Sequence, residues 1–141
     1  TLSLSFLLFA FTGCIKDSTV SNSNDILGSW EVVGIQSNMP YDWNGDGFEE
    51  TDIYRNYSYC QRDIVLVFDE GGYGESRQGC NAPWQSMYWQ LLNGNRTLRI
   101  QFPGDELELD IRQFNYNTIR GDDYVYVGGR NFVITYTFQR R

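Results

Sequence analysis

Hydrophobic and polar residues alternate along most of the chain that follows Cys60. The clearest case is the segment 106–112, in which Leu107, Leu109 and Ile111 are separated by charged residues. Successive side chains of a β-strand point to opposite faces, so this pattern predicts a strand with one buried and one solvated face. The same two-residue period predicts further strands at 62–68, 73–77, 85–92, 96–102, 117–120, 124–127 and 131–139.

Short turns rich in Gly, Asn and Asp separate these segments. Asn93-Gly94 is the strongest hairpin signal, because both residues readily adopt the positive φ that a two-residue turn requires. The other predicted turns are Asp69-Glu70-Gly71-Gly72, Pro103-Gly104-Asp105, Gly121-Asp122-Asp123 and Gly128-Gly129. Tight turns join consecutive antiparallel strands, so we predict an all-β protein with an antiparallel, up-and-down, eight-stranded barrel. The alternative is a two-sheet β-sandwich, but the only long connection, residues 38–61, comes early for a Greek-key crossover.

The composition agrees with a small β-domain and excludes several functions. Of the 141 residues, 16% are aromatic, 14 are glycine and only three are proline, as expected for many short strands and turns. A formal net charge of -7 disfavours a nucleic-acid partner. The sequence contains no histidine, which removes the commonest general base, the commonest transition-metal ligand and every Ser-His or Cys-His arrangement. We therefore predict that the protein is not an enzyme and does not bind nucleic acid.

A hydrophobic run lies at the start of the sequence. Residues 2–11 are almost all apolar, which is the length of a signal-peptide core and too short to span a bilayer. The run ends in Phe11-Thr12-Gly13-Cys14, which resembles the lipobox of bacterial lipoproteins. In that family the cysteine is lipidated and the peptide bond before it is cut.

This resemblance implies three regions. Residues 1–13 would be a lipoprotein signal peptide that lacks its basic start, and residues 14–25 would be the lipidated Cys14 with a flexible polar tether. The folded domain would then occupy residues 26–141. The resemblance also implies an outer-membrane lipoprotein that faces the periplasm or the cell surface and contacts the membrane through its lipid anchor.

Two cysteines, Cys60 and Cys80, remain once Cys14 is assigned to the lipid anchor. The implied envelope compartment is oxidising, so we predict a disulfide between them. The sequence has no Cys-x-x-Cys spacing, which disfavours a metal or redox role. A bridge that closes a loop of about 21 residues would stabilise the fold by ~3 kcal/mol on the chain-entropy model.

The acidic loop, residues 42–52, is the one stretch whose chemistry indicates a site. Calcium loops of the EF-hand type place oxygen ligands at positions 1, 3 and 5, a backbone carbonyl at 7 and a carboxylate at 9. The corresponding residues are Asp42, Asn44, Asp46, Phe48 and Glu50. Position 12 is Ile53 instead of the usual glutamate, so the loop resembles the shorter calcium loops of envelope and extracellular repeats. We predict a structural calcium ion here, and the alternative is a solvated acidic turn without metal.

The first predicted strand, 27–35, contains Gly28-Ser29-Trp30, the Gly-x-Trp form that begins the first strand of lipocalins. The lipobox, the polar tether, the acidic loop, the two later cysteines and the closing Phe138-Gln139-Arg140 follow in an order that resembles the small lipocalin-like domain of Gram-negative envelope lipoproteins. The resemblance implies that Trp30 plugs the narrow end of the barrel. It also implies that Arg140 packs over the indole ring in a cation–π contact.

Two functional hypotheses follow. The resemblance favours a binding module whose barrel mouth holds a small apolar or aromatic molecule. The candidate lining residues are Tyr73, Tyr88, Tyr124, Tyr126, Phe132 and Tyr136. The alternative is a structural or interaction lipoprotein without a small-molecule ligand, in which Tyr54, Tyr57 and Tyr59 contact another envelope protein. An open aromatic cavity would favour the first hypothesis, and a filled interior with an exposed tyrosine patch would favour the second.

Overall fold

A computed structural model describes residues 23–141, and the predictions for the signal peptide, for Cys14 and for most of the tether lie outside these residues. No helix in the described part of the chain is long and apolar enough to cross a membrane. The strands are β1 (Gly28–Tyr41), β2 (Glu50–Asp52), β3 (Ile64–Phe68), β4 (Tyr73–Gln78), β5 (Gln85–Leu92), β6 (Thr97–Phe102), β7 (Asp105–Phe114), β8 (Thr118–Val127) and β9 (Arg130–Arg140). Three short 3-10 helices accompany them: η1 (Ser23–Ile26), η2 (Tyr54–Asn56) and η3 (Glu70–Gly72).

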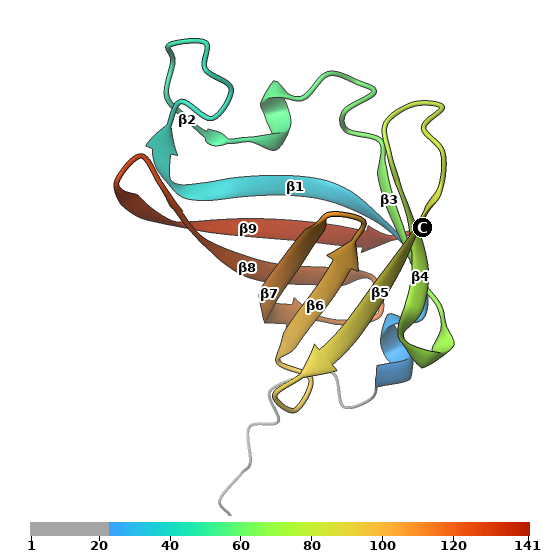
Figure 1. The fold of residues 1–141 in the computed structure, drawn as a ribbon. Coiled ribbons are helices and arrows are strands. Elements are labelled where there is room, and N and C mark those ends of the chain that lie inside the picture. Colours follow the sequence, from blue (N-terminus) through green and yellow to red (C-terminus); the bar gives the residue numbers. More distant parts are fainter. Residues whose placement is uncertain (1–22) are drawn as a thin grey trace, which may run out of the picture.

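Eight of the strands form one closed antiparallel barrel (Figure 1). Each strand from β3 to β8 pairs with the next one along the chain, and β1 pairs with both β3 and β9, which closes the sheet. The short strand β2 pairs only with the second half of β1. The predicted up-and-down barrel is therefore confirmed, and the two-sheet alternative is wrong.

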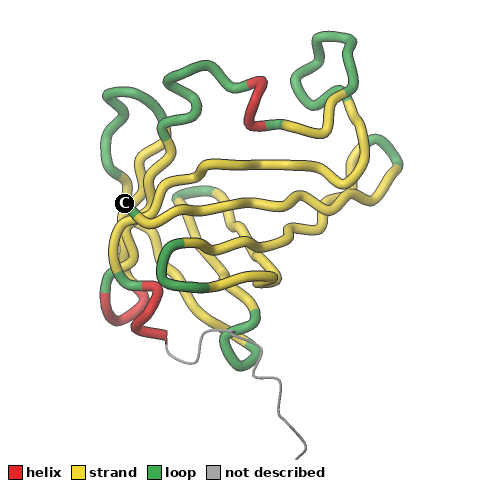
Figure 2. Tube along the Cα trace, turned by 180° about the vertical axis from the view of Figure 1, so that it is seen from behind, coloured by secondary structure: helices red, strands yellow, loops and turns green. Residues whose placement is uncertain are grey.

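β1 is much longer than β3, and this difference in length leaves the barrel open at one end. β1 has 14 residues and β3 has five. As a result, β1 pairs with β3 only as far as Glu31, whereas it pairs with β9 as far as Ser37. The segment 53–63 runs alongside β1 beyond this point, where the N–H of Ile53 donates to the carbonyl of Ile35 at 3.0 Å (Figure 2). The connection predicted at 38–61 thus contains strand residues and most of the segment 53–63, which we call the covering segment.

Side chains that point inward from alternate positions form the core. In β7, Leu109 is fully buried while its neighbours Glu108 and Asp110 are exposed, as the alternation predicts. Burial of one large apolar side chain stabilises a fold by roughly 1.5–3 kcal/mol, so this face of the sheet holds the barrel together. The largest fully buried side chains include Trp30, Phe68, Met87, Leu98, Ile100, Ile119, Phe132 and Phe138.

The turn predicted at Gly121-Asp122-Asp123 is wrong, because β8 continues through these residues. A Cβ atom at Gly121 would lie only 2.8 Å from a side-chain atom of the neighbouring strand β7. The absence of a side chain at this position therefore allows the two strands to approach each other closely. Asp122 accepts hydrogen bonds at 2.7 Å from both Thr135 and Arg112. Its carboxylate is therefore satisfied by the flanking strands, and a Gly-Asp-Asp sequence here belongs to a strand.

Trp30 closes the end of the barrel next to the described N-terminus. Its side chain is completely buried, and its Nε1–H donates to the carbonyl of Ile26 at 2.8 Å. The guanidinium of Arg140 lies 4.3 Å from the centroid of the indole ring, within the range of a cation–π contact. Arg140 also donates hydrogen bonds of 2.6–2.8 Å to the carbonyl oxygens of Asp25, Leu27 and Tyr116. The structure thus places Arg140 over Trp30, as the lipocalin resemblance implies.

Candidate ligand-binding site

A cavity of about 760 Å³ lies at the end of the barrel opposite Trp30. Its deepest lining residues are Val32, Ile35, Leu66 and Phe138, all apolar and buried. The volume falls within the roughly 300–1,000 Å³ that is typical of pockets for small molecules. The cavity exists because the five-residue strand β3 does not extend as far along the barrel as β1. The inner faces of β1 and β9 are therefore left uncovered at this end. It is the candidate binding site of the barrel.

The polar groups of this cavity are carboxyl, amide and hydroxyl groups. Asp105 and Glu106 lie at its exposed rim, at the start of β7, whereas Asp123 and Tyr136 are partly buried on the strands β8 and β9. Gln78 and Gln85 complete the rim from β4 and β5. Among the described residues, no lysine or arginine lines the cavity. Its polar lining is therefore uniformly neutral or negative.

Burial raises the pKa of the Asp123 carboxyl above its usual value. Burial is the largest cause, and repulsion from Asp105 and Glu108 acts in the same direction, while a hydrogen bond from the backbone N–H of Tyr124 opposes it. In the described part of the chain, no arginine forms an ion pair with Asp123. The cavity therefore contains a carboxylate that has no cationic partner among the described residues.

Tyr136 places a phenol beside this carboxylate. Burial, followed by the nearby Asp123, Tyr57 and Asp105, raises the pKa of Tyr136 to about 12. The hydroxyl is therefore protonated at neutral pH and is available as a hydrogen-bond donor. Its ring adds aromatic surface to the cavity wall, next to Phe138, with 6.4 Å between the ring centroids.

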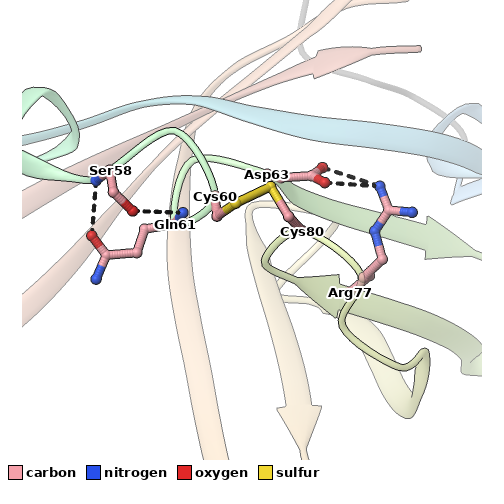
Figure 3. Close-up of a disulfide and its surroundings, with 6 residues drawn as sticks. All are labelled: Ser58, Cys60, Gln61, Asp63, Arg77 and Cys80. Carbon is pink, nitrogen blue, oxygen red and sulfur yellow. Dashed lines mark hydrogen bonds and ion pairs between the residues drawn. A yellow bond between two sulfur atoms is a disulfide. The ribbon is translucent and has the colours of Figure 1, made fainter.

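The disulfide between Cys60 and Cys80 (Figure 3) confirms the predicted pairing, and residues close to both cysteines in the chain line the cavity mouth. It joins the covering segment, at a point after η2, to the loop between β4 and β5. Beside it, Arg77 donates to both carboxylate oxygens of Asp63 at 3.1 and 3.2 Å. The covering segment contributes Tyr57 to the cavity, and the β4–β5 loop contributes Ala82 and Pro83. The disulfide therefore fixes two parts of the mouth relative to each other.

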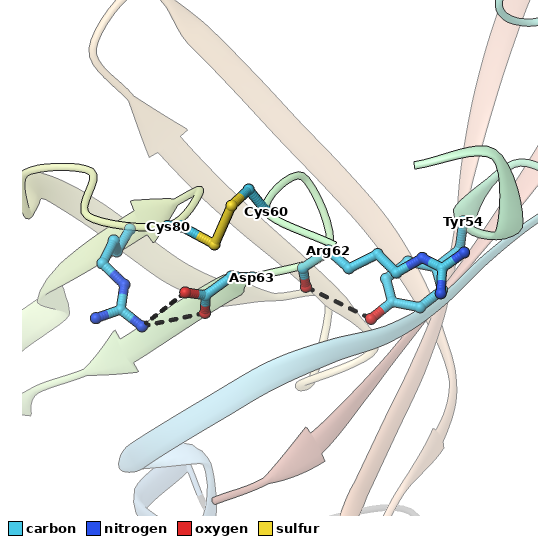
Figure 4. A network of polar contacts seen from close by, with 6 residues as sticks. Tyr54, Cys60, Arg62, Asp63 and Cys80 are labelled. Carbon is cyan, nitrogen blue, oxygen red and sulfur yellow. Dashed lines mark hydrogen bonds and ion pairs between the residues drawn. A yellow bond between two sulfur atoms is a disulfide. The ribbon is translucent and has the colours of Figure 1, made fainter. Parts of the chain in front are cut away.

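The covering segment is held by contacts among its own residues (Figure 4). The Tyr54 hydroxyl donates to the carbonyl of Arg62 at 3.4 Å, and the Arg62 guanidinium lies 5.5 Å from the centroid of the Tyr54 ring. Arg62 also donates to the carbonyl of Arg55 at 2.6 Å. Tyr54 and Tyr57 are partly buried against the core, whereas Tyr59 is exposed. Of the three tyrosines predicted to form a surface patch, Tyr57 thus belongs to the cavity.

Only one of the six predicted lining residues, Tyr136, lines the cavity. The prediction is wrong for four others, because they point outward and are more than half exposed: Tyr73, Tyr88, Tyr124 and Tyr126. Tyr73 and Tyr88 face each other across β4 and β5 on the outer surface, with 5.6 Å between their ring centroids. Phe132 is buried elsewhere, against Trp43.

Tyr57 and Asp123 are among the lining residues that the sequence does not predict. The sequence patterns place Asp123 in a turn and Tyr57 on the outer surface. The signal for Asp123 is present in the sequence, because it lies in phase with Ile119, Gly121 and Val125 on one face of a strand. The aspartate interrupts the apolar pattern of that face at the cavity.

The acidic loop forms a second candidate site, far along β1 from Trp30. Carboxylate oxygens of Asp42, Asp46 and Glu50 all lie within 4.8 Å of one another. Two oxygens that bind one Ca²⁺ at ~2.4 Å are at most ~4.8 Å apart, so this spacing fits a shared ion. Glu50 Oε1 is also buried without a hydrogen-bond partner in the described structure, as expected for an oxygen that has a metal as its partner.

Hydrogen bonds within the loop give it a defined shape. The Asp42 carboxylate accepts from the backbone N–H groups of Asp46 and Gly47 at 3.0 and 2.9 Å. Asn44 bonds to Asp46 through both its amide oxygen and its amide nitrogen, and the N–H of Phe48 donates to the same aspartate at 2.8 Å. The structure therefore brings three of the five predicted ligand residues together and ties the other two to Asp46.

Trp43 attaches the acidic loop to the barrel. Its ring packs edge-on against Tyr41 and Phe132, with centroid distances of 4.9 and 5.0 Å. Phe132 belongs to β9 and is almost completely buried. The loop is thus anchored to the core by aromatic packing, while Asp46 is exposed and Asp42 and Glu50 are partly buried.

The sequence matches DUF5004, a domain of unknown function, over residues 12–139, and the chain belongs to this family. The matched region contains Cys14, the acidic loop, both disulfide cysteines and the barrel as far as Gln139 in β9. No curated protein matches the chain. The family assignment therefore covers the candidate sites without assigning them a function.

Proposed function

We propose that the protein is a lipid-anchored envelope lipoprotein whose lipocalin-like barrel binds a small apolar or aromatic molecule and catalyses no reaction. The observation that carries the proposal is the cavity of about 760 Å³, with buried apolar residues at its base and a mouth braced by a disulfide. The sequence supports the absence of catalysis, since it offers no histidine as a general base.

The proposed membrane attachment rests on Cys14 and the lipobox-like sequence before it. Lipid on this cysteine would hold the barrel at the outer membrane, on the periplasmic side or at the cell surface, with residues 15–25 as a tether. Intact-mass measurement of the native protein tests this part, because it should show a glyceride-linked cysteine as the first residue. A mature chain with an unmodified Cys14 would contradict it.

Binding of a neutral fluorescent probe tests the proposed cavity. N-phenyl-1-naphthylamine should bind with a micromolar Kd and become more fluorescent, because the buried base of the cavity excludes water. The variant Gln85→Trp, which fills the mouth from β5, should weaken binding about tenfold or more, a change of ~1.4 kcal/mol. Gln85 lines the cavity and its neighbour Ser86 does not, so Ser86→Trp is the matched control and should leave the affinity unchanged.

A second candidate function, that of a structural or interaction lipoprotein, is favoured by the exposed tyrosines on the outer surface. Tyr73 and Tyr88 pair across adjacent strands, and Tyr124 and Tyr126 lie on β8. Tyrosine is enriched in protein interfaces. Equal probe binding by the Gln85→Trp and Ser86→Trp variants, or no probe binding at all, would favour this candidate over the cavity.

We further propose that the acidic loop binds a structural calcium ion through Asp42, Asp46 and Glu50. The converging carboxylates and the buried, unpartnered oxygen of Glu50 support the proposal. The ion would offset the repulsion among three carboxylates and would stiffen the connection between β1 and β2. Asn44 and the carbonyl of Phe48 are the sequence candidates for the remaining ligands.

Thermal unfolding with and without calcium tests this proposal. At a free calcium concentration about 100 times the Kd, the folded state should gain ~2.7 kcal/mol, and the Tm should rise by several degrees. Glu50→Gln should weaken calcium binding about tenfold or more, since it removes one charged ligand. The adjacent Glu49→Gln lies outside the cluster and should bind calcium like the unmodified protein. A Tm that does not respond to calcium or chelator would contradict the proposal.

A further inference from the structure

We infer that the cavity selects molecules that combine an apolar or aromatic body with a positively charged amine, and that Asp123 binds the ammonium group. This inference rests on the proposed small-molecule binding and adds the chemical class of the ligand. Its basis is the position of an unpaired, partly buried carboxylate, that of Asp123, among apolar and aromatic residues.

The charged residues that line the cavity are all acidic. Asp105, Glu106 and Asp123 line it, and no arginine or lysine of the described residues does. Glu106 is paired with Arg99 at 2.9 Å on the outer surface, but neither Asp105 nor Asp123 has an ion-pair partner in the described structure. An incoming cation would be attracted, and an incoming carboxylate would be repelled.

The depth of Asp123 strengthens this preference. Asp105 is exposed at the rim, whereas Asp123 is partly buried beside Tyr136, and burial is the main cause of its raised pKa. A charge pair interacts more strongly where water is partly excluded than in bulk solvent. An ammonium group at Asp123 would supply the missing partner and satisfy the carboxylate.

The neighbouring residues suit the rest of such a ligand. Tyr57 and Tyr136 present aromatic rings, which attract cations at their faces. Val32, Leu66 and Phe138 provide a buried apolar surface for the body of the molecule. The cavity therefore offers a partner for the ammonium group and a partner for the apolar body of such a molecule.

Three ligands with the same naphthalene ring and different charges test the inference. Isothermal titration calorimetry at neutral pH would compare 1-naphthylmethylamine, which is a cation, with the neutral 1-naphthalenemethanol and the anionic 1-naphthoate. We expect the amine to bind about tenfold more tightly than the alcohol, and the carboxylate to bind most weakly.

Variants of Asp123 assign the preference to this residue. Asp123→Asn should bring the affinity for the amine to within about threefold of that for the alcohol, with both affinities measured on the variant. Asp123→Glu keeps the charge and should retain the preference, which controls for a general effect of substitution. Glu75→Gln removes an exposed carboxylate on the outer face of β4 and should change neither affinity.

The outcomes separate this inference from the proposed function. If the alcohol binds but the amine binds no more tightly, or if Asp123→Asn keeps the preference, the inference is wrong and the binding function stands. If none of the three ligands binds, the inference and the proposed function both fail.

Discussion

Replacing Trp30 by alanine is expected to destabilise the protein by ~3–5 kcal/mol, the usual cost of removing a fully buried tryptophan. The substitution removes the hydrogen bond to Ile26, the contact with the Arg140 guanidinium and the edge-on contact with Phe114 at 6.2 Å between ring centroids. It also leaves a void where strands β1 and β9 close the barrel. Urea unfolding followed by circular dichroism measures the loss.

Trp84→Ala is the control for this substitution. Trp84 is 45% exposed and contacts the Arg77 guanidinium at 5.1 Å from the ring centroid. Its loss should cost no more than about 1 kcal/mol, because an exposed cation–π contact contributes little. A similar loss of stability in the two variants would contradict the role of Trp30 as the plug of the barrel.

Removing the disulfide by the double substitution Cys60→Ser and Cys80→Ser is expected to cost ~3 kcal/mol. The bridge spans a sequence separation of 20, so its loss frees a loop of moderate length in the unfolded chain. It also frees the covering segment from the β4–β5 loop at the cavity mouth. We therefore expect weaker binding of N-phenyl-1-naphthylamine as well as a lower midpoint of urea unfolding.

Reduction of the unmodified protein is the matched control for the disulfide. A reducing agent should lower its stability to that of the double variant, and the double variant should not respond to the same agent. Unchanged stability after reduction would contradict a stabilising role of the bridge. Lost stability with unchanged probe affinity would show that the strands alone define the mouth.

The sequence predicts most of the fold because most strands have one solvated face. In β7, acidic residues mark the outer face so clearly that the alternation gives both the strand and its orientation. β8 differs, since Gly121, Asp122 and Asp123 satisfy the rules for a turn. Their strand conformation depends on contacts with β7 and β9, such as the bond between Asp122 and Thr135, and these are not visible in a local pattern.

The orientation of the tyrosines illustrates a second limit. In the sequence Tyr124-Val125-Tyr126-Val127 both faces of the strand carry hydrophobic groups, so alternation alone does not say which face is buried. Pairing of Val125 with the buried Phe132 on β9 places the valines inside and the tyrosines outside. The lining of the cavity therefore follows from strand register, which only the closed barrel defines.

Local spacing was more informative for the acidic loop. The positions of Asp42, Asp46 and Glu50 in a calcium-loop pattern predict that their side chains converge, and the structure brings them together. A loop of this kind is shaped by bonds between residues two to five positions apart, which a sequence pattern captures. Its attachment through Trp43 to Phe132 joins residues far apart in the sequence and was not predicted.

The most direct test of the binding cavity is a methyl-resolved nuclear magnetic resonance titration of the protein with 1-naphthalenemethanol. Val32 lines the cavity, whereas the adjacent Val33 is exposed on the outer surface, so the two report on opposite faces of β1. We expect saturable shifts for the methyl groups of Val32, Ile35 and Leu66 and none for Val33. Unchanged cavity methyl groups, or shifts confined to the outer surface, would contradict the proposed binding function.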